Sequence, residues 1–186
     1  IWSIKTKKKE VFLTFDDGPI PEVTPWVLET LKAYDAKATF FCVGDNVRKN
    51  KRFYQMILEQ GHKVGNHTMN HLNGWMNFNK TYFENIGLCK ELVDSDLFRP
   101  PYGKIKPSQI IRLKKNYRIV MWDVLSKDYD ADLSGEQCFD RIRKNCKPGS
   151  IVVFHDSIKA EKRLRYALPK SLEYLKQQGF TFSSIS

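Results

Sequence analysis

Short apolar runs alternate along the chain with longer amphipathic segments, and this alternation constrains the fold more than any other feature. We predict seven strands, at residues 11–15, 38–43, 63–65, 97–99, 117–122, 151–154 and 180–184. We predict six helices, at residues 23–34, 46–60, 81–93, 107–115, 134–145 and 161–178, the last interrupted or kinked near Pro169. Alternation of this kind is typical of parallel strands with crossover helices, in an open sheet or a closed barrel.

Two of the predicted helices begin with a capping signature. Thr81 with Glu84, and Ser134 with Gln137, have the spacing at which a hydroxyl and a side chain three residues later satisfy each other's backbone N–H groups. We therefore expect a capping box at the start of each of these helices.

The length and composition predict a single domain over residues 1–186. A chain of 186 residues with 41% hydrophobic residues can bury a substantial core, and we find no linker, repeat or low-complexity tract. No apolar run approaches the roughly 20 residues that a membrane-spanning helix needs, so we expect no transmembrane segment in this chain. The chain begins at Ile1 rather than Met, which indicates that something upstream has been removed and leaves the compartment open.

The cysteines and the charge restrict the function further. Four scattered cysteines without a C-x-x-C pair argue against a zinc ribbon or a redox motif and predict buried free thiols, with one disulfide as the alternative. The net charge of +10 indicates either a solvated basic surface or attraction to an anionic polymer such as an acidic glycan. No motif that reads nucleic acid is present, and we expect no nucleic-acid partner.

Unusual polar residues stand where the predicted strands end. They are Asp16 and Asp17 after the first strand, His67 and His71 after the third, Arg99 at the end of the fourth, Asp123 and Asp128 after the fifth, and His155 and Asp156 after the sixth. In a parallel α/β fold the carboxyl ends of the strands share one face, and that face carries the active site. We therefore expect these side chains to gather in one cleft.

The two histidines of this set indicate a metal site. His67 and His71 are four residues apart, a spacing that can direct both imidazoles at one ion. With one carboxylate of the neighbouring Asp pair they make three ligands and leave a position open for water, as in catalytic zinc sites. Such a metal lowers the pKa of its water towards about 7 and polarises a bound carbonyl. The alternative is a pair of histidines with a purely structural role.

At this point the chain resembles a known family, the polysaccharide deacetylases, also called the NodB-homology or fourth carbohydrate-esterase family. The resemblance extends from Val11 to about Ile185. Four segments match the family's motifs: residues 14–19 (TFDDGP), 67–71 (HTMNH), 99–103 (RPPYG) and 153–155 (VFH). The resemblance implies a distorted (β/α) barrel of about seven parallel strands, with residues 1–186 as a single NodB-homology catalytic domain.

The resemblance also implies a role for each matching residue. Asp16 is the general base, Arg99 orients it, the Tyr102 backbone N–H helps to hold the oxyanion, and His155, tuned by Asp128, is the general acid. Asp17, His67 and His71 are the metal ligands. The implied cofactor is a divalent metal, with Zn²⁺ as the first candidate and Co²⁺, Ni²⁺ or Mn²⁺ as alternatives.

The fourth motif departs from the family pattern. The family commonly has Asp-x-x-Asp-Trp there, whereas this chain has Leu125 in place of the first Asp and Tyr129 in place of the Trp. We predict that Tyr129, Val153, Pro101 and Trp75 contact the substrate, although Trp75 could equally well pack within its loop. We assign Trp122 to the core and His62 to a structural role.

The predicted function is metal-dependent hydrolysis of N-acetyl groups on the amino sugars of a polysaccharide or oligosaccharide. Peptidoglycan, a chitin-like polymer and an exopolysaccharide are the candidate substrates, and the glycan could be anionic. The alternatives are an O-acetyl glycan esterase or related metal-dependent C–N hydrolase on the same scaffold, and a non-catalytic glycan-binding module. We expect a monomer, and the resemblance favours a site of action in the cell envelope or elsewhere outside the cytoplasm.

Overall fold

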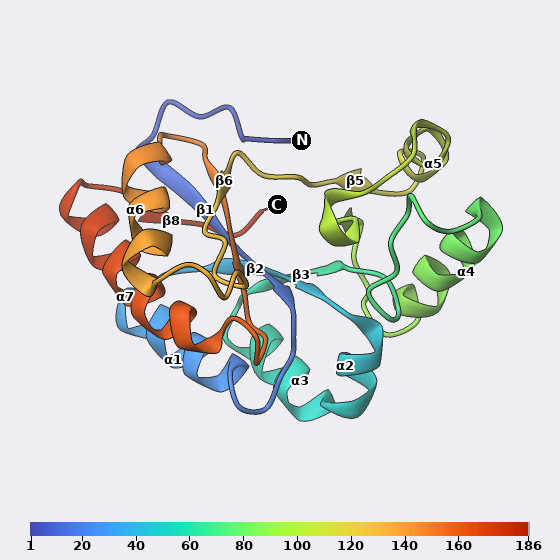
Figure 1. Cartoon of the computed structure of the whole chain (residues 1–186), viewed down its shortest axis with the longest axis horizontal. Coiled ribbons are helices and arrows are strands. Elements are labelled where there is room, and N and C mark those ends of the chain that lie inside the picture. Colours follow the sequence, from blue (N-terminus) through green and yellow to red (C-terminus); the bar gives the residue numbers. More distant parts are fainter. Residues whose placement is uncertain (186) are drawn as a thin grey trace.

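A single curled sheet of parallel strands forms the centre of the protein. The computed structural model describes residues 1–185. Its strands are β1 (Glu10–Asp17), β2 (Ala38–Cys42), β3 (Lys63–Asn66), β4 (Leu97–Phe98), β5 (Arg118–Ile119), β6 (Val124–Leu125), β7 (Ile151–His155) and β8 (Thr181–Phe182). Seven of them lie side by side in the order β5-β4-β3-β2-β1-β7-β6, and β8 pairs with the start of β1 (Figure 1). The row curls into a half-barrel, which confirms the predicted distorted (β/α) barrel in one α/β domain.

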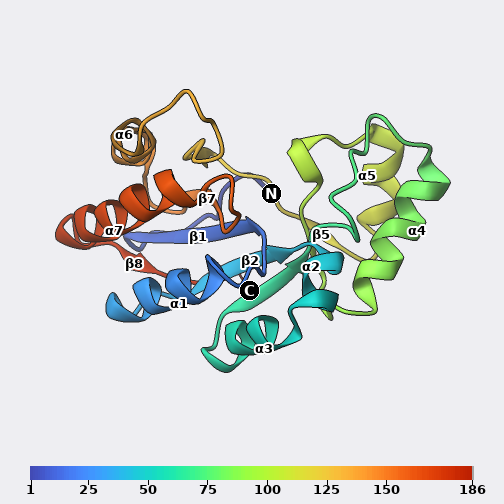
Figure 2. The ribbon, with the colours of Figure 1, turned by 60° about the horizontal axis from the view of Figure 1, so that its bottom comes forward.

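Helices cover the outer face of this sheet. They are α1 (Thr24–Ala33), α2 (Gly44–Lys49), α3 (Lys51–Glu59), α4 (Asn79–Lys90), α5 (Pro107–Leu113), α6 (Gly135–Asn145) and α7 (Glu161–Gln177), with a short 3₁₀ turn, η1, at Pro101–Gly103. In Figure 2, α1 and α7 lie beside β1 and β2, whereas α4 and α5 form a separate group at the end of the sheet that contains β5. None of the helices in residues 1–185 is both long and apolar enough to cross a membrane.

The two faces of strand β1 contribute to two different cores. Phe15 belongs to the large outer core between sheet and helices, whereas Phe12 belongs to a smaller cluster on the inner face of the curl. Successive side chains of a strand point to opposite faces. Thr14 and Asp16 therefore share the inner face with Phe12, and both are buried. The apolar run of β1 is thus the support for a carboxylate that faces the inside of the half-barrel.

The N-terminal segment crosses the open side of the half-barrel. Among the described residues, no strand pairing joins the edge strands β5 and β6. Residues 1–4 run across this gap: Met121 N donates to Ile1 O at 2.7 Å and Ile4 N donates to Gly149 O at 2.8 Å. Figure 1 shows this segment between β5 and β6. The segment therefore covers the inner cluster at the edge of the sheet where β1 begins.

The fifth predicted strand is shorter than the sequence indicated. Only Arg118–Ile119 pairs as β5, and a further strand, β6 at Val124–Leu125, lies in the stretch we predicted as a loop. The carbonyls of Val120 and Met121 accept hydrogen bonds from the Arg99 guanidinium, at 3.2 and 3.0 Å. These two residues bond to Arg99 rather than continuing the strand, and the predicted strand over residues 117–122 is correct only at Arg118–Ile119.

Two helix predictions also need correction. The predicted helix at residues 46–60 is two helices, because Asn50 has a non-helical backbone (φ −126°, ψ 45°) and its side chain donates to Pro19 O at 3.0 Å. The predicted capping box of Thr81 and Glu84 is wrong. The helix starts earlier, at Asn79, whose side chain bonds to Ser108 at 3.1 Å across the neighbouring segment.

Two further local predictions are confirmed, and a third, the interruption of the last helix, is wrong. Ser134 and Gln137 form the expected reciprocal capping box at the start of α6. All four cysteines are free, and three of them are buried. Helix α7 continues through Pro169, so the predicted interruption there is wrong. Leu168 and Leu172 on either side of the proline are fully buried, so tertiary packing outweighs the roughly 3 kcal/mol that an interior proline costs.

Candidate active site

Strand register brings the polar motifs together. Asp16 and His155 are direct Cα partners in the pairing of β1 with β7. On the other side of β1, Asp17 pairs with Cys42 at the end of β2, and His67 N donates to Cys42 O at 3.0 Å. Because these strands are parallel, their carboxyl ends lie together at the same end of the sheet. Three motifs that are far apart in the sequence are therefore neighbours there.

Asp17, His67 and His71 form a cluster that could hold a metal ion. One ligand atom from each lies within 4.8 Å of the others. His71 Nε2 is 3.3 Å and His67 Nε2 is 3.9 Å from Asp17 Oδ1. That carboxylate oxygen is buried and has no hydrogen-bond partner. A buried, unpaired carboxylate oxygen that faces two imidazole nitrogens fits a divalent cation, since the ion supplies the missing partner.

The environment of His67 prepares it to be a ligand. Its Nδ1 lies 2.8 Å from the carbonyl oxygen of Arg99. A carbonyl can only accept, so Nδ1 carries the hydrogen and the lone pair of Nε2 is left facing Asp17. Burial lowers the pKa of His67 to about 4, although the nearby Asp16 opposes this shift. The imidazole is therefore neutral, as metal coordination requires.

The loops around this cluster hold strained backbones. Asp17, Thr68, His71 and Tyr102 have φ angles of 87°, 65°, 59° and 59°. Residues other than glycine seldom adopt positive φ, and such strain collects at functional sites. Tyr102 also places its ring 4.5 Å from that of His71. The loops after β1, β3 and β4 are thus held in conformations that the local sequence alone would not favour.

Arg99 is fully buried behind the cleft and pairs with Asp16. Its Nη1 donates to Asp16 Oδ1 and to Thr14 Oγ1, both at 2.7 Å, and its guanidinium stacks 4.1 Å above the Phe41 ring. Burial raises the pKa of Asp16, but the Arg99 cation, with smaller contributions from two histidines, outweighs it and holds that pKa below its usual value. Asp16 is therefore an ionised carboxylate in a buried position.

His155 and Asp128 form a second pair on the opposite side of the cleft. His155 Nδ1 lies 2.7 Å from Asp128 Oδ1, and the His155 backbone N–H donates to Asp128 Oδ2 at 2.8 Å. Burial lowers the pKa of His155, but the Asp128 carboxylate outweighs this effect and raises the pKa to about 9. Tyr129 packs edge-on against the imidazole at 4.9 Å. This histidine is accordingly protonated at neutral pH.

A cleft of about 480 Å³ opens over these groups. Its walls are Asp16, Asp17, His67, His71, Pro100, Tyr102, Trp122, Leu125, Tyr129, Val153, His155 and Lys159. Of the predicted substrate contacts, Tyr129 and Val153 line it. Pro101 is buried between two residues that do. Arg99 and Asp128 lie behind the wall, each supporting a residue that faces the cleft.

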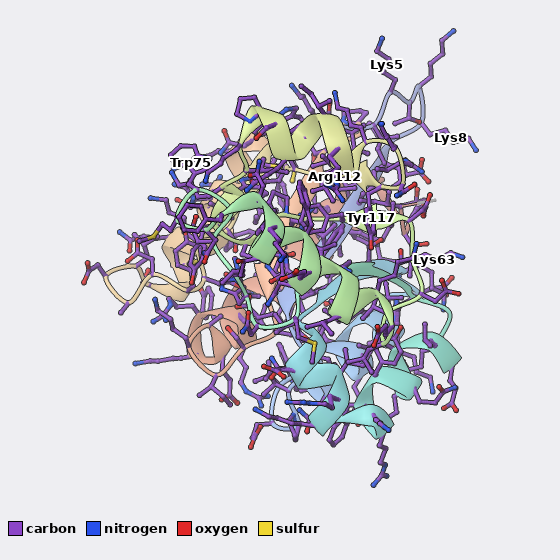
Figure 3. The ribbon with its side chains drawn as sticks, turned by 90° about the vertical axis from the view of Figure 1, so that its right-hand side faces the viewer. Lys5, Lys8, Lys63, Trp75, Arg112 and Tyr117 are labelled. Atoms are coloured by element: carbon purple, nitrogen blue, oxygen red, sulfur yellow. The ribbon has the colours of Figure 1, made fainter. Side chains whose placement is uncertain are left out.

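Trp75 stands apart from the cleft wall. It is 56% exposed, its Nε1 donates to Ile105 O at 3.1 Å, and Lys104 Nζ lies 4.0 Å from the centre of its ring. Figure 3 shows Trp75 at the edge of the molecule. The structure therefore places this tryptophan in a loop that packs against Lys104 and Ile105, outside the cleft itself.

Two placements differ from the sequence predictions, and one residue of the cleft was missed. Trp122, assigned to the core, also lines the cleft, and Lys159 lines it although no motif contains it. Asp123, expected at the site, accepts hydrogen bonds from Ser150 Oγ and Ile151 N at the start of β7. Because Asp123 precedes the unrecognised strand β6, it lies at the opposite edge of the sheet. Recognition of β6 would have corrected this placement.

A larger depression of about 600 Å³ lies at the opposite edge, near the starts of β3 and β4. Its histidine, His62, accepts a hydrogen bond from Ala38 N at 3.1 Å, and burial lowers its pKa to about 4. Within residues 1–185, the one cluster with metal-ligand spacing is that of the cleft. His62 thus has the structural surroundings that its sequence context indicated.

Comparison with known proteins gives a consistent result. The family model for polysaccharide deacetylases matches residues 3–120. A peptidoglycan-N-acetylglucosamine deacetylase of Bacillus cereus is 37% identical over 193 residues, which cover 100% of this chain and 90% of that protein.

Solved structures agree with this match. A crystal structure of the Bc1960 peptidoglycan N-acetylglucosamine deacetylase superposes with a TM-score of 0.90 at 32% identity, covering 99% of this chain and 89% of the other. A Bacillus anthracis protein described as a pseudoenzyme of the fourth carbohydrate-esterase family superposes with a TM-score of 0.85 at 27% identity, covering 100% of this chain and 66% of the other. The same fold is therefore found with and without activity, and function has to be argued from the residues of the cleft.

Proposed function

This chain belongs to the polysaccharide deacetylase family, and on that premise we propose that it is a metal-dependent hydrolase of N-acetyl groups on the amino sugars of peptidoglycan. One observation carries the proposal: the carboxylate of Asp16 and the imidazole of His155 face one cleft from paired positions, beside a cluster of metal-ligand spacing. The names of the relatives make the N-acetylglucosamine units of peptidoglycan the first candidate substrate. We propose that residues 1–186 act as one catalytic domain and as a monomer.

Asp17, His67 and His71 would hold the metal. Two imidazoles and one carboxylate suit zinc, with cobalt, nickel or manganese as alternatives. When bound, the ion supplies a Lewis acid that polarises the acetyl carbonyl and lowers the pKa of water towards about 7. The tautomer of His67, set by the Arg99 carbonyl, keeps Nε2 free for this role.

Asp16 would act as the general base. Its depressed pKa keeps it ionised, so it can accept a proton from the water that attacks the acetyl carbon. Arg99 holds the carboxylate by the 2.7 Å hydrogen bond and neutralises its charge in the buried position. The base is thus fixed in orientation before the substrate arrives.

His155 would act as the general acid. Its pKa of about 9 keeps the imidazole protonated at neutral pH, and its Nδ1 is engaged by Asp128. The proton on Nε2 is then the one available to the departing amine nitrogen as the C–N bond breaks. Asp128 orients the ring and stabilises the imidazolium, as the carboxylate of a catalytic triad does.

The remaining walls would position the sugar. The Tyr102 backbone N–H is the proposed donor to the oxyanion, and loss of one such donor typically costs about 10²–10³ in rate. Tyr129 and Val153 would contact the acetyl group or its ring, and Pro101 would act indirectly by fixing its neighbours. Trp75, exposed outside the cleft, would contact a more distant sugar of the chain.

The positive charge of the protein supports an anionic glycan as its substrate. Lys159 lines the cleft, and no carboxylate of the described chain forms an ion pair with it. The lysines of the N-terminal segment lie at the other edge of the sheet, where Figure 3 shows Lys5 and Lys8 projecting away from the protein. We propose that Lys159 contacts an anionic group of the glycan and that the protein acts in the cell envelope.

Acetate release tests the proposal. The protein would be assayed on peptidoglycan fragments, chito-oligosaccharides and O-acetylated glycans, with and without a chelator and added divalent metals. We expect metal-dependent acetate release from N-acetyl substrates, and a loss of about 10²–10⁴-fold in Asp16→Asn with metal binding retained. Full activity in Asp16→Asn would overturn the role of the base, and activity that survives complete metal removal would overturn the metal site.

The same assay separates the alternatives. Faster release from O-acetyl than from N-acetyl glycans would identify an esterase, for which an alkoxide leaves with less help from His155 than an amine needs. Binding of glycans without any acetate release would identify a non-catalytic module.

A further inference from the structure

Asp156, the residue after β7, is a fully buried carboxyl group that the proposed reaction does not use. Its backbone N–H donates to Asp16 O at 3.2 Å. Its side chain accepts from Gly18 N at 3.1 Å and lies 2.6 Å from the hydroxyl of Thr24. One residue therefore bonds the β1 loop on both sides of Asp17.

The network continues to the start of α1. Thr24 Oγ1 accepts a hydrogen bond from Ile20 N at 2.8 Å, so the chain from Gly18 to Thr24 is tied to one buried carboxyl. The fit around this carboxyl is close. A Cβ atom added at Gly18 would lie 2.0 Å from Asp156 Oδ2, so the position requires glycine. The carboxyl group thus determines which residue can follow Asp17 and how the loop folds.

Asp17 itself is held in an unfavourable backbone conformation. Its φ of 87° is in the region that residues with a side chain seldom adopt. Its carbonyl accepts from Asn46 Nδ2 at 2.8 Å, and its neighbours on both sides bond to Asp156. Such a conformation persists when the surroundings over-determine it. The Asp156 network supplies that constraint and so aims the Asp17 carboxylate at His67 and His71.

The carboxyl group has no ionic partner. No cationic side chain of the described residues forms an ion pair with Asp156. Burial, with a smaller contribution from Asp17, raises its pKa to about 8, against the hydrogen bonds from Thr24 and Gly18. These surroundings favour the uncharged acid over the carboxylate. An asparagine has nearly the same shape and can bond to both groups, accepting from Gly18 N and, with the direction of that bond reversed, donating to Thr24 Oγ1.

We propose that Asp156 is a positioning residue that sets the metal affinity of the cleft by holding Asp17 through Gly18 and Thr24. The inference rests on the proposed metal site and adds a residue outside the ligand set and outside the acid–base pair. Residues that orient metal ligands typically change affinity or activity about 10–100-fold when they are removed.

The chain contains a matched control for this network. Asp123 accepts from one backbone N–H, of Ile151 at 2.7 Å, and from one hydroxyl, of Ser150 at 2.9 Å. Asp156 bonds to the same two kinds of group. The two carboxyls flank opposite ends of β7, and only Asp156 is next to the cleft. Truncation of Asp123 thus removes an equivalent pair of bonds without touching the proposed ligands.

The test is a zinc titration of the full chain against a chromogenic chelator. The variants are Asp156→Ala, Asp156→Asn, Thr24→Val and Asp123→Ala, each checked for folding by circular dichroism. We expect the zinc affinity to fall about 10–100-fold in Asp156→Ala, less in Thr24→Val, and to stay within about threefold in Asp156→Asn and Asp123→Ala. Excess zinc should restore most of the deacetylase activity of Asp156→Ala, because the three ligands remain.

The outcomes separate this inference from the proposed function. If the wild-type chain does not bind zinc or another divalent metal, the proposed metal site fails. If the wild type binds and Asp156→Ala binds equally well, or Asp123→Ala loses as much affinity, the positioning role of Asp156 fails. If Asp156→Ala does not fold, Thr24→Val decides, since it removes one hydroxyl and keeps the side-chain shape: unchanged affinity there would overturn the inference.

Discussion

Two histidines on opposite sides of one cleft have opposite protonation behaviour. We call Asp17, His67 and His71 the metal side, and Asp128 and His155 the acid side. On the metal side, burial lowers the pKa of His67 to about 4. On the acid side, Asp128 raises the pKa of His155 to about 9 against the effect of burial.

The difference comes from what each Nδ1 faces. His67 Nδ1 bonds to a neutral carbonyl, at 2.8 Å, whereas His155 Nδ1 bonds to a carboxylate, at 2.7 Å. A carbonyl fixes the tautomer without favouring a positive charge, but a carboxylate favours the imidazolium. The same side chain is therefore neutral in one place, as the proposed metal ligand must be, and positively charged in the other, as the proposed general acid must be.

Removal of either imidazole should give the largest effect and distinguish the two sides. His71→Ala should reduce acetate release to background and weaken zinc binding by more than about 100-fold, since a ligand itself is lost. His155→Ala should lose about 10²–10⁴ in rate and keep its zinc affinity. Activity assays with zinc titrations check both. Equal loss of zinc in the two variants would contradict the division of the cleft.

Asp128→Asn should lower the pKa of His155, so that this imidazole becomes more like the neutral His67. Without the Asp128 carboxylate, the largest cause that raises the pKa of His155 is gone and only the smaller effects of Asp16 and Asp17 oppose burial. The pKa therefore falls, and the alkaline limb of kcat/KM moves to lower pH. At pH 8 we expect a loss of about 10–100-fold, within the usual contribution of a positioned acid. A pH–rate profile measures this, with Asp130→Asn in the same loop as the matched control. An unshifted alkaline limb would contradict the role of Asp128.

The same pair predicts how stability depends on pH. The folded pKa of His155 is raised from 6.5 to about 9. Protonation of His155 therefore contributes stability that is complete below pH 6.5 and is lost as the pH rises through about 9. Urea unfolding between pH 6 and 10 should show this loss in the wild type, and a smaller one in Asp128→Asn.

Arg99 is buried behind both sides of the cleft, and Arg99→Lys should destabilise the fold. The guanidinium makes four hydrogen bonds, to Asp16, Thr14 and two backbone carbonyls, which an ammonium group cannot all replace. We expect the free energy of unfolding to fall by about 3 kcal/mol and the Tm to fall by roughly 6–12 °C. Arg143→Lys, in an exposed pair with Asp140, should leave the Tm unchanged. A Tm of Arg99→Lys equal to that of the wild type would contradict this stabilising role of the guanidinium.

The smallest effect on activity is expected for Lys159 in the wall of the cleft. Lys159→Gln should lower kcat/KM about 1.5- to 5-fold on a carboxylate-bearing glycan, because an exposed ion pair contributes little. The effect should shrink with added salt and be absent on a neutral chito-oligosaccharide. Lys63→Gln, at the far edge of the sheet and labelled in Figure 3, is the matched control. Equal effects on both substrates would remove Lys159 from substrate recognition.

Much of the fold could be predicted from the sequence because its signals are local. Periodicity indicated most of the strands and helices. The capping box of Ser134 and Gln137 was predicted correctly because it depends only on two residues that are three positions apart. The convergence of Asp16, His67 and His155 followed from one rule, that parallel strands end on one face. Short pieces were predicted less well. The strand β6 has two residues and little periodicity, and its omission misplaced Asp123.

The sequence by itself determined which chemical groups this protein brings to one edge of its sheet: carboxylates, imidazoles and a guanidinium, each following a strand. Only the tertiary structure decided their states. Burial and the partner of each Nδ1 make His67 neutral and His155 charged, and the buried Asp156 carboxyl ties down the loop that carries Asp17. The physical reason is that a pKa or a side-chain direction depends on neighbours within a few ångströms, and these neighbours come from segments that are far apart along the chain.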